Sequence, residues 1–131
     1  MKKSVYLLLF GILLSSCGNE KQNSDYSEEE QQSASEEMNA YFGREFEKEV
    51  QESPETQTRR GLKTNYDRWD DYSNLKYAED LEQARERMDY LDMVDVAALD
   101  EDTRLSYDLY RRQVQNEIDD YDFRFYNYPI E

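Results

Sequence analysis

The scarcity of glycine and proline constrains the fold of this chain more than any other feature. Only four glycines and two prolines occur among 131 residues, and from about residue 38 onward they stand where segments would end. β-Branched residues are few in the same region, whereas Glu, Gln, Arg, Leu and Ala, which favour helices, are common. The sequence therefore predicts an all-α fold, a partial helical bundle of about three main helices over residues 38–131.

Apolar spacing and capping residues locate these helices. The pattern predicts helices over residues 36–51, 54–60, 74–91 and 102–122. The residues that favour helix N-termini are Ser33 or Ser35, Ser53, Ser73 and Asp100, and Gly61 is expected to end the short helix. The side chains expected to be buried are Met38, Phe42, Phe46, Val50, Tyr77, Leu81, Ala84, Met88, Leu91, Met93, Val94, Val96, Leu99, Leu105, Tyr107, Leu109, Tyr110, Val114, Ile118 and Tyr121.

Three aromatic residues recur in the segment 63–72, which is expected to be a loop. Tyr66, Trp69 and Tyr72 stand at three-residue steps, a spacing that favours aromatic side chains fixing the loop onto a helical body. A platform for carbohydrate is the alternative. The interleaved aspartates are the kind of residue that binds calcium, but no glycine stands where the turn of an EF-hand loop needs one.

The first residues form a short apolar run behind two positive charges. Two lysines precede the largely apolar residues 5–14, a run too short for a bilayer-spanning helix, which needs roughly 20 residues. Two small serines then lead to Cys17, the only cysteine of the chain. This pattern predicts a lipoprotein signal peptide over residues 1–16, followed by lipidation of Cys17. An ordinary secretory signal with an incidental cysteine is the alternative.

A lipid on Cys17 would make the membrane the first partner of this chain and place it in the bacterial cell envelope. Gly18 rather than aspartate follows the cysteine, so we expect the outer membrane, on its periplasmic or its surface face. Residues 17–37 are rich in Gln, Asn, Ser and Glu and predict a lipidated, disordered tether. The formal net charge of −15 argues against nucleic acid and against attraction to anionic lipid, since phosphate binding needs basic patches.

The residues of most catalytic centres are missing from the sequence. The chain has no histidine, which excludes H-E-x-x-H zinc sites and Ser-His-Asp triads built from this chain alone. No glycine-rich phosphate loop occurs, and the many carboxylates need a pocket that separates their pKa values before they can act as acid and base. We therefore expect no catalytic residue, no metal ligand and no cofactor in this chain.

Four passages follow a recognisable family pattern. They are Ser53-Pro54-Glu55-Thr56 with Gly61-Leu62, Tyr66-Asp67 and Tyr72-Ser73; Leu91-Asp92 with Val96-Ala97-Ala98-Leu99; Arg104-Leu105-Ser106-Tyr107-Asp108-Leu109; and Tyr128-Pro129-Ile130. Together they resemble the opening of the bacterial family called domain of unknown function 885, over about residues 38–131. The passage from Arg104 to Leu109 is the most specific.

The resemblance implies a helical protein that is several times longer and often a lipoprotein. It also implies an H-E-x-x-H-type zinc motif far downstream, which is typical of a zinc-dependent peptidase. No residue here matches that motif, so zinc is implied only for a downstream part. We expect this chain to be the N-terminal helical segment of such a protein. Arg104, Ser106, Tyr107 and Asp108 are expected to serve helix packing, with a place in a substrate channel as the alternative.

An aromatic run follows the last expected helix. Large apolar side chains are unusually frequent there for the end of a chain. We expect them to form a partner surface that consists of Phe123, Phe125, Tyr126 and Tyr128. The partner would be the missing C-terminal part or another envelope protein. A self-contained small lipoprotein that acts as a binding or scaffolding module is the alternative reading of the whole chain, and a glycan-binding module using Trp69 is a weaker one.

Overall fold

The computed structural model describes residues 25–126, and the regular elements in that range are all helices. They are α1 (Glu28–Glu52), α2 (Pro54–Arg59), α3 (Asn74–Asp92), η1 (Val96–Ala98), α4 (Glu101–Asp120) and η2 (Tyr121–Phe123). The predicted all-α fold with three main helices and a short one is confirmed. None of the described helices has the length and apolar character needed to cross a bilayer.

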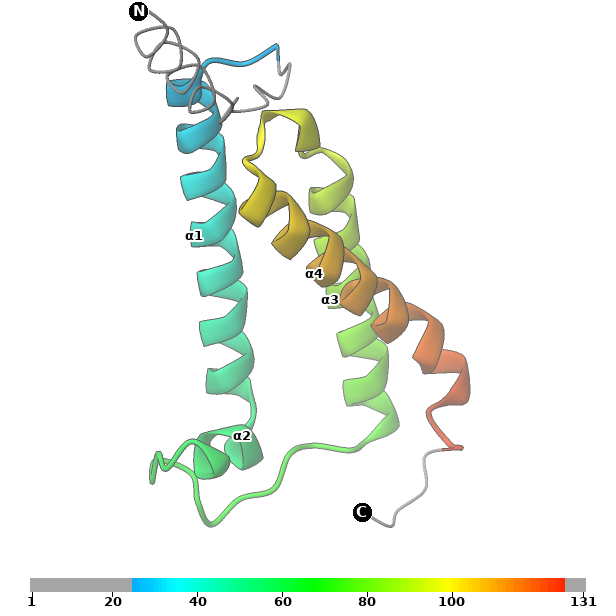
Figure 1. Ribbon diagram of the computed structural model, residues 1–131. Coiled ribbons are helices and arrows are strands. Elements are labelled where there is room, and N and C mark those ends of the chain that lie inside the picture. Colours follow the sequence, from blue (N-terminus) through cyan, green and yellow to red (C-terminus); the bar gives the residue numbers. More distant parts are fainter. Residues whose placement is uncertain (1–24, 127–131) are drawn as a thin grey trace, which may run out of the picture.

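The three long helices form an open bundle rather than a closed one. Helices α3 and α4 pack against each other, and α1 meets this pair through η1 and α4. Figure 1 shows α1 close to the start of α4 at one end of the molecule and apart from α3 at the other end, where α2 and the following loop lie. The bundle is therefore packed at one end and splayed at the other.

Helix α1 begins at Glu28, eight residues before the predicted start. Ser27 and Glu30 form a capping box: the Glu30 N–H donates to Ser27 Oγ at 3.3 Å, and the Ser27 N–H donates to Glu30 Oε2 at 2.9 Å. Three glutamates occupy the first turn, where the helix dipole favours negative charge. The prediction of a disordered tether up to residue 37 is therefore wrong for residues 28–37. The tether residues before residue 25 lie outside the described range.

A buried glutamine joins α1 to α2. Gln57 is 5% exposed, and its Nε2 donates to the carbonyls of Val50 and Gln51 at 3.0 and 2.9 Å. Those carbonyls belong to the last turn of α1, where four C=O groups lack intrahelical partners. Gly61 has a φ of +79° and ends α2 in the left-handed conformation that glycine adopts without strain. The predicted cap at Ser53 and stop at Gly61 are confirmed.

The predicted caps of the two later helices are confirmed as well. Ser73 accepts from the Lys76 N–H at the start of α3, and Asp100 accepts from the Thr103 N–H at 2.7 Å at the start of α4. The hydrogen bond from Thr103 lowers the pKa of Asp100 below its ordinary value, because it favours the charged carboxylate. Asp100 N–H also donates to Ser35 Oγ at 2.9 Å, so this corner touches α1.

The core draws on all three long helices. It consists of Met38, Tyr41, Ala84, Met88, Leu91, Leu99, Tyr107 and Val114. The Tyr107 hydroxyl donates to the Leu91 carbonyl at 2.9 Å and so ties α4 to the last turn of α3. Two of these side chains, Met38 and Tyr41, come from α1, so α1 completes the core between α3 and α4.

Several side chains predicted to be buried lie at the surface instead. Leu105 and Leu109 of α4 are 60% and 59% exposed, and Met93 is 77% exposed. Only one of the two apolar stripes of α4 faces the other described helices, because the bundle is open on its remaining side. Phe46, 41% exposed, lies under the Arg60 guanidinium at 4.2 Å from the ring centre. The structure therefore leaves apolar surface on α4 without cover from residues 25–126.

Candidate functional site

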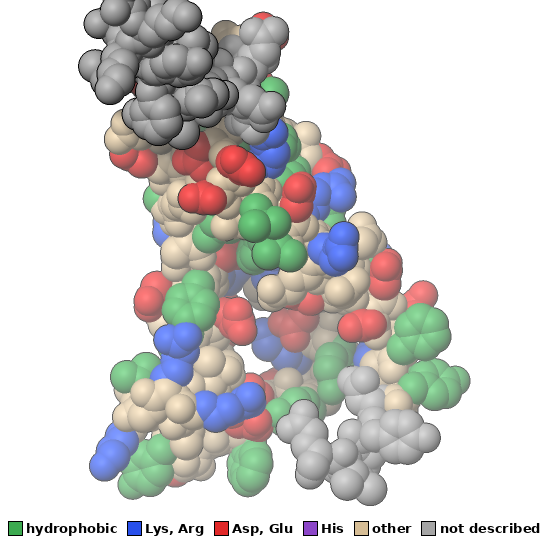
Figure 2. Space-filling view, viewed as in Figure 1, with side chains coloured by type: hydrophobic (Ala, Val, Ile, Leu, Met, Phe, Trp, Pro, Cys, Tyr) green, Lys and Arg blue, Asp and Glu red, His purple; other side chains and the backbone are tan. Residues whose placement is uncertain are grey.

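A groove of about 730 Å³ occupies the splayed end of the bundle. Its walls come from the second half of α1, from α2 and residues 70–72, and from facing parts of α3 and α4. Figure 2 shows the corresponding hollow between α1 and the α3–α4 pair. The groove exists because α1 packs against η1 and α4 at the other end and diverges from α3 here (Figure 1).

Aromatic rings line the inner end of this groove. Phe42 and Tyr110 meet edge to face with centres 5.2 Å apart, and Tyr41 stacks on Tyr90 at 4.1 Å behind them. Burial raises the pKa of Tyr41 to about 12 and raises that of Tyr110 as well, because a charged phenolate is costly away from water. Both phenols therefore keep their protons at ordinary pH, and the inner end of the groove is uncharged at these two rings.

Carboxylates outnumber basic groups along the groove. The acidic lining residues are Glu45, Glu49, Glu52, Asp70, Asp71, Asp80, Glu117 and Asp120, against Lys48, Lys76, Arg87 and Arg124. Two of the basic groups are already paired: Arg87 with Glu117, and Lys76 with Asp80 at 2.8 Å and with Glu52 at 3.7 Å. The groove is thus negatively charged, and the Lys76–Glu52 pair links α3 to α1 across its outer end.

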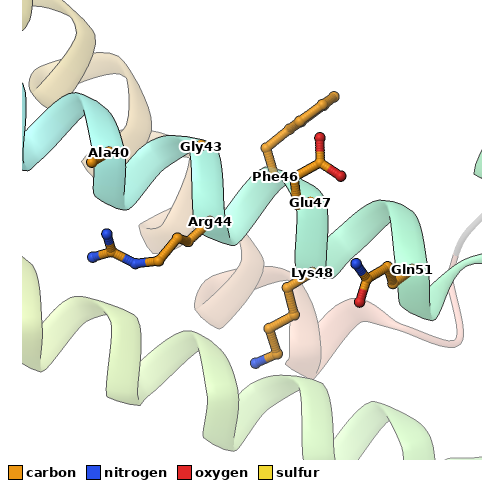
Figure 3. A pocket seen from close by; sticks show the side chains of 7 residues that line it. All are labelled: Ala40, Gly43, Arg44, Phe46, Glu47, Lys48 and Gln51. Carbon is orange, nitrogen blue, oxygen red and sulfur yellow. The ribbon is translucent and has the colours of Figure 1, made fainter.

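A second, smaller depression lies along the middle of α1 and shares Phe46 and Lys48 with the groove. Its lining residues are Ala40, Gly43, Arg44, Phe46, Glu47, Lys48 and Gln51. Figure 3 shows Phe46 and Glu47 on one side of the helix, and Arg44 and Lys48 on the other. Since all of these side chains belong to one helix, they do not enclose a ligand.

The loop between α2 and α3 is held by polar groups rather than by its aromatic rings. Asp70 accepts from Ser53 Oγ at 2.6 Å and from the Glu55 N–H at 3.0 Å, both at the start of α2. The rings of Tyr66, Trp69 and Tyr72 are 69%, 84% and 61% exposed. The prediction that these aromatics fix the loop to the helical body is therefore wrong for Tyr66 and Trp69, whereas the Tyr72 hydroxyl donates to Glu55 Oε1 of α2 at 2.9 Å.

The aromatic run after α4 lies at the surface as far as it is described. Phe123, Phe125 and Tyr126 are 62%, 66% and 77% exposed. The Arg124 guanidinium lies over the rings of Tyr121 and Phe125, 4.1 and 4.3 Å from their centres. Tyr128, the fourth residue of the predicted partner surface, lies outside the described residues, as does Cys17.

The residues of the family passage in α4 have mainly local and packing contacts. Tyr107 is 5% exposed and makes the bond to Leu91 described above, and Arg104 Nη2 donates to the Leu99 carbonyl at 3.1 Å. Ser106 Oγ donates to the Asp102 carbonyl one turn earlier, and Asp108 is exposed. None of the four lines the groove, so packing accounts for Tyr107 and Arg104.

The zinc that the family resemblance implies does not fit the described residues. Zinc sites need three or four nitrogen, sulfur or carboxylate ligands. Residues 25–126 contain no cluster of three or more such side chains in a geometry that could hold a metal ion, and the chain has no histidine.

Comparison with known proteins identifies one family. The family described as "Bacterial protein of unknown function (DUF885)" matches residues 54–131. Among curated proteins no match was found, and none was found among solved structures. The matched range begins at the first residue of α2 and leaves α1 outside.

Proposed function

Because this chain belongs to the DUF885 family of bacterial proteins of unknown function, we propose that it forms the N-terminal helical part of that family's domain and works by packing against further protein, without catalysis of its own. The observation that carries this proposal is the apolar surface of α4 and η2. Leu105 and Leu109 are about three-fifths exposed, as is Phe123, although a helix at the surface of a finished domain turns a polar face outward.

The protein that covers this surface would be the remainder of the family domain. We infer a zinc-dependent peptidase activity for the whole family domain only from what the sequence resemblance implies, and the described residues supply no zinc site. Peptidase chemistry therefore belongs to residues outside this chain or to a partner chain. In this proposal, the contribution of α4 is to support that part by burying Leu105, Leu109 and the aromatic side chains after Asp120.

Site-specific photocrosslinking tests the packing partner. A photoreactive phenylalanine analogue replaces Phe125 in one variant and exposed Glu37 of α1 in a control variant, and both are irradiated in cells. We expect an adduct from the Phe125 position only, with a polypeptide that carries an H-E-x-x-H motif. The absence of any adduct at Phe125, or equal adducts at both positions, would contradict the proposal.

The proposal also places this chain at the cell envelope, held by a lipid on Cys17. Its support is the signal-like sequence before that cysteine, which is the only one in the chain. Two or more acyl chains give stable membrane anchoring. Radioactive palmitate should label the wild-type chain and leave Cys17→Ser unlabelled, while Ser24→Ala, a substitution outside the lipidation motif, keeps the label. Labelling of Cys17→Ser would refute the anchor.

A self-contained binding module in the cell envelope is the second candidate, and the arrangement of the C-terminal aromatics favours it. The Arg124 guanidinium contacts the rings of both Tyr121 and Phe125, so these contacts restrict the two rings before a partner binds. Here the crosslinked protein would lack the zinc motif. Replacing Phe123, Phe125 and Tyr126 together with serine should then abolish its capture, and retained capture would remove this candidate.

A further inference from the structure

The groove at the splayed end has an apolar floor between two acidic walls. Half-buried apolar side chains line its inner part, and this floor consists of Phe42, Tyr77, Leu81, Tyr110 and Tyr121. The carboxylates of the wall on α1 are Glu45, Glu49 and Glu52, and those of the wall on α3 and α4 are Asp80, Glu117 and Asp120. Figure 1 shows α1 on one side of the opening and the α3–α4 pair on the other. An apolar strip with negative charge along both sides is therefore open at this end of the molecule.

Three of the four basic side chains in the groove have partners within the protein. Arg87 and Lys76 form the ion pairs with wall carboxylates described above, and the Arg124 guanidinium lies over two aromatic rings. Lys48 is exposed and forms no ion pair within residues 25–126. Eight acids stand against these four bases, so the lining of the groove has a net charge of −4.

Wall carboxylates on both sides of the floor are left without a counter-charge. Glu45, Glu49 and Asp120 form no ion pair within the described residues 25–126. Glu45 and Glu49 are one helical turn apart and so lie on the same side of α1, whereas Asp120 is the last residue of α4 on the opposite wall. Like charges one turn apart repel each other, and a bound cation would relieve that repulsion. The walls therefore favour lysine or arginine side chains.

The charge of the walls also acts on the aromatic rings at the inner end of the groove. Burial is the main cause of the raised pKa values of Tyr41 and Tyr110, and the negative charge of Glu45 raises both further, whereas the Arg87 guanidinium opposes the shift. The face of an aromatic ring attracts cations in its own right. A positively charged group between the α1 wall and these rings would therefore be stabilised by both.

We propose that this groove binds a basic amphipathic helix of a partner protein, whose apolar face covers the floor and whose Lys or Arg side chains meet the carboxylates of both walls. Helix-in-groove recognition places the apolar anchors of one helix on such a floor, and a volume of about 730 Å³ lies in the range of binding clefts. The bound helix would be the fourth member of a bundle that three long helices leave open. An acidic helix would be repelled by both walls, so charge selects the partner.

The groove contact differs from the packing surface proposed for α4. Leu105 and Leu109, which carry that surface, do not line the groove. The partner helix therefore binds a face of the molecule that the remainder of the family domain, as proposed above, leaves open, and each contact can be tested without the other.

A model peptide serves as the probe for groove binding. It is a helix of leucine and lysine about four turns long, with the leucines on one face, the lysines on the other and a fluorescent label at its N-terminus. Fluorescence anisotropy measures its binding to the full chain. We expect saturable binding that weakens with added salt, because exposed ion pairs are screened. A peptide of the same composition in shuffled order lacks the apolar face and should bind about tenfold more weakly.

Two pairs of variants test the walls and the floor separately. Glu45→Gln with Glu49→Gln should raise the Kd of the leucine–lysine peptide about fivefold, because two exposed ion pairs are lost. Glu86→Gln with Asp108→Asn removes the same charge from exposed positions outside the groove and should leave the Kd unchanged.

For the floor, Leu81→Ser removes apolar contact area and should raise the Kd about tenfold. Leu109→Ser is its control, because Leu109 is exposed and does not line the groove. Circular dichroism checks that all four variants keep the wild-type helix content.

Each contrary outcome overturns the groove proposal without touching the proposed function. Equal binding of the ordered and the shuffled peptide would mean attraction to the net charge of the chain alone. Equal effects of the two charge variants, or wild-type binding by Leu81→Ser, would place the peptide outside the groove. Tighter binding of a leucine–glutamate peptide would refute the selection by charge. Photocrosslinking at Phe125 measures the α4 contact separately, so either proposal can fail alone.

Discussion

Replacing Tyr107 with phenylalanine isolates the contribution of one hydrogen bond to the packing of α4 on α3. The ring is 5% exposed, and its hydroxyl donates to the Leu91 carbonyl at 2.9 Å. The substitution keeps the ring and removes only this donor. Its cost depends on whether the carbonyl is left without a partner, since an unsatisfied buried acceptor costs about 1–3 kcal/mol.

The Leu91 carbonyl keeps a second partner in this variant. The Val94 N–H donates to it at 3.1 Å from the turn after α3, so Tyr107→Phe loses a net hydrogen bond and leaves no orphaned acceptor. We therefore expect a loss of about 1 kcal/mol in the free energy of unfolding. For a domain of this size that lowers Tm by roughly 4–8 °C. Tyr107→Ala, which also removes the ring from the core, should cost about 3–5 kcal/mol.

Thermal and urea unfolding, followed by circular dichroism, measure both variants. Tyr77→Phe is the matched control, because Tyr77 is half-buried on α3 and its hydroxyl has no hydrogen-bond partner among the described residues. It should unfold within about 0.5 kcal/mol of wild type. If Tyr107→Phe and Tyr77→Phe were equally stable, the assignment of the Tyr107 hydroxyl as a link between α3 and α4 would be refuted.

Three further perturbations test the caps and the aromatic core. Ser27→Ala removes the capping box of α1 and should cost about 1 kcal/mol, whereas Ser33→Ala, at an exposed position inside the helix, should not; equal losses in chemical unfolding would contradict the observed start of α1. Asp100→Asn keeps the cap and removes its titration. The folded pKa of Asp100 is lowered, so its carboxylate stabilises the wild-type fold at neutral pH. That stabilisation is lost as pH falls below the ordinary pKa of 3.8 and through the folded pKa. The variant should therefore lose less stability than wild type in acid unfolding curves. Burial raises the pKa values of Tyr41 and Tyr110, that of Tyr41 to about 12. The contribution of their neutral side chains to the free energy of unfolding is therefore present below pH 10 and lost as pH rises through the folded pKa values. Absorbance at 295 nm should show both tyrosines ionising at higher pH than exposed Tyr66, and ionisation of both together with Tyr66 would contradict their burial.

The positions of the helix starts could be predicted mainly from capping residues. Ser53, Ser73 and Asp100 start helices in the structure as the sequence indicates, because a side-chain oxygen next to a helix start acts through local geometry alone. The start of α1 was missed, since residues 28–34 contain no apolar periodicity. The signal that could have revealed it is Ser27 followed three residues later by Glu30, the spacing of a capping box.

Burial on α4 and in the loop could not be predicted, because it depends on neighbours that local patterns do not reveal. Leu105 and Leu109 have the same spacing as buried stripes, yet no described helix covers them. Trp69 and its neighbouring tyrosines have the composition of a packed loop, but the polar contacts of Asp70 position the loop and leave the rings outside. The groove was missed for a related reason: it arises from the angle between α1 and the α3–α4 pair.

The boundary of the family match has a consequence for how this protein folds. The match starts at Pro54, whereas the core includes Met38 and Tyr41 of α1. A polypeptide that begins at the homology boundary would expose the faces of Met88, Leu91 and Val114 that α1 shields. The unit recognised by sequence similarity is therefore smaller than the unit that shares one hydrophobic core, and the helix outside the match completes the core of the helices inside it.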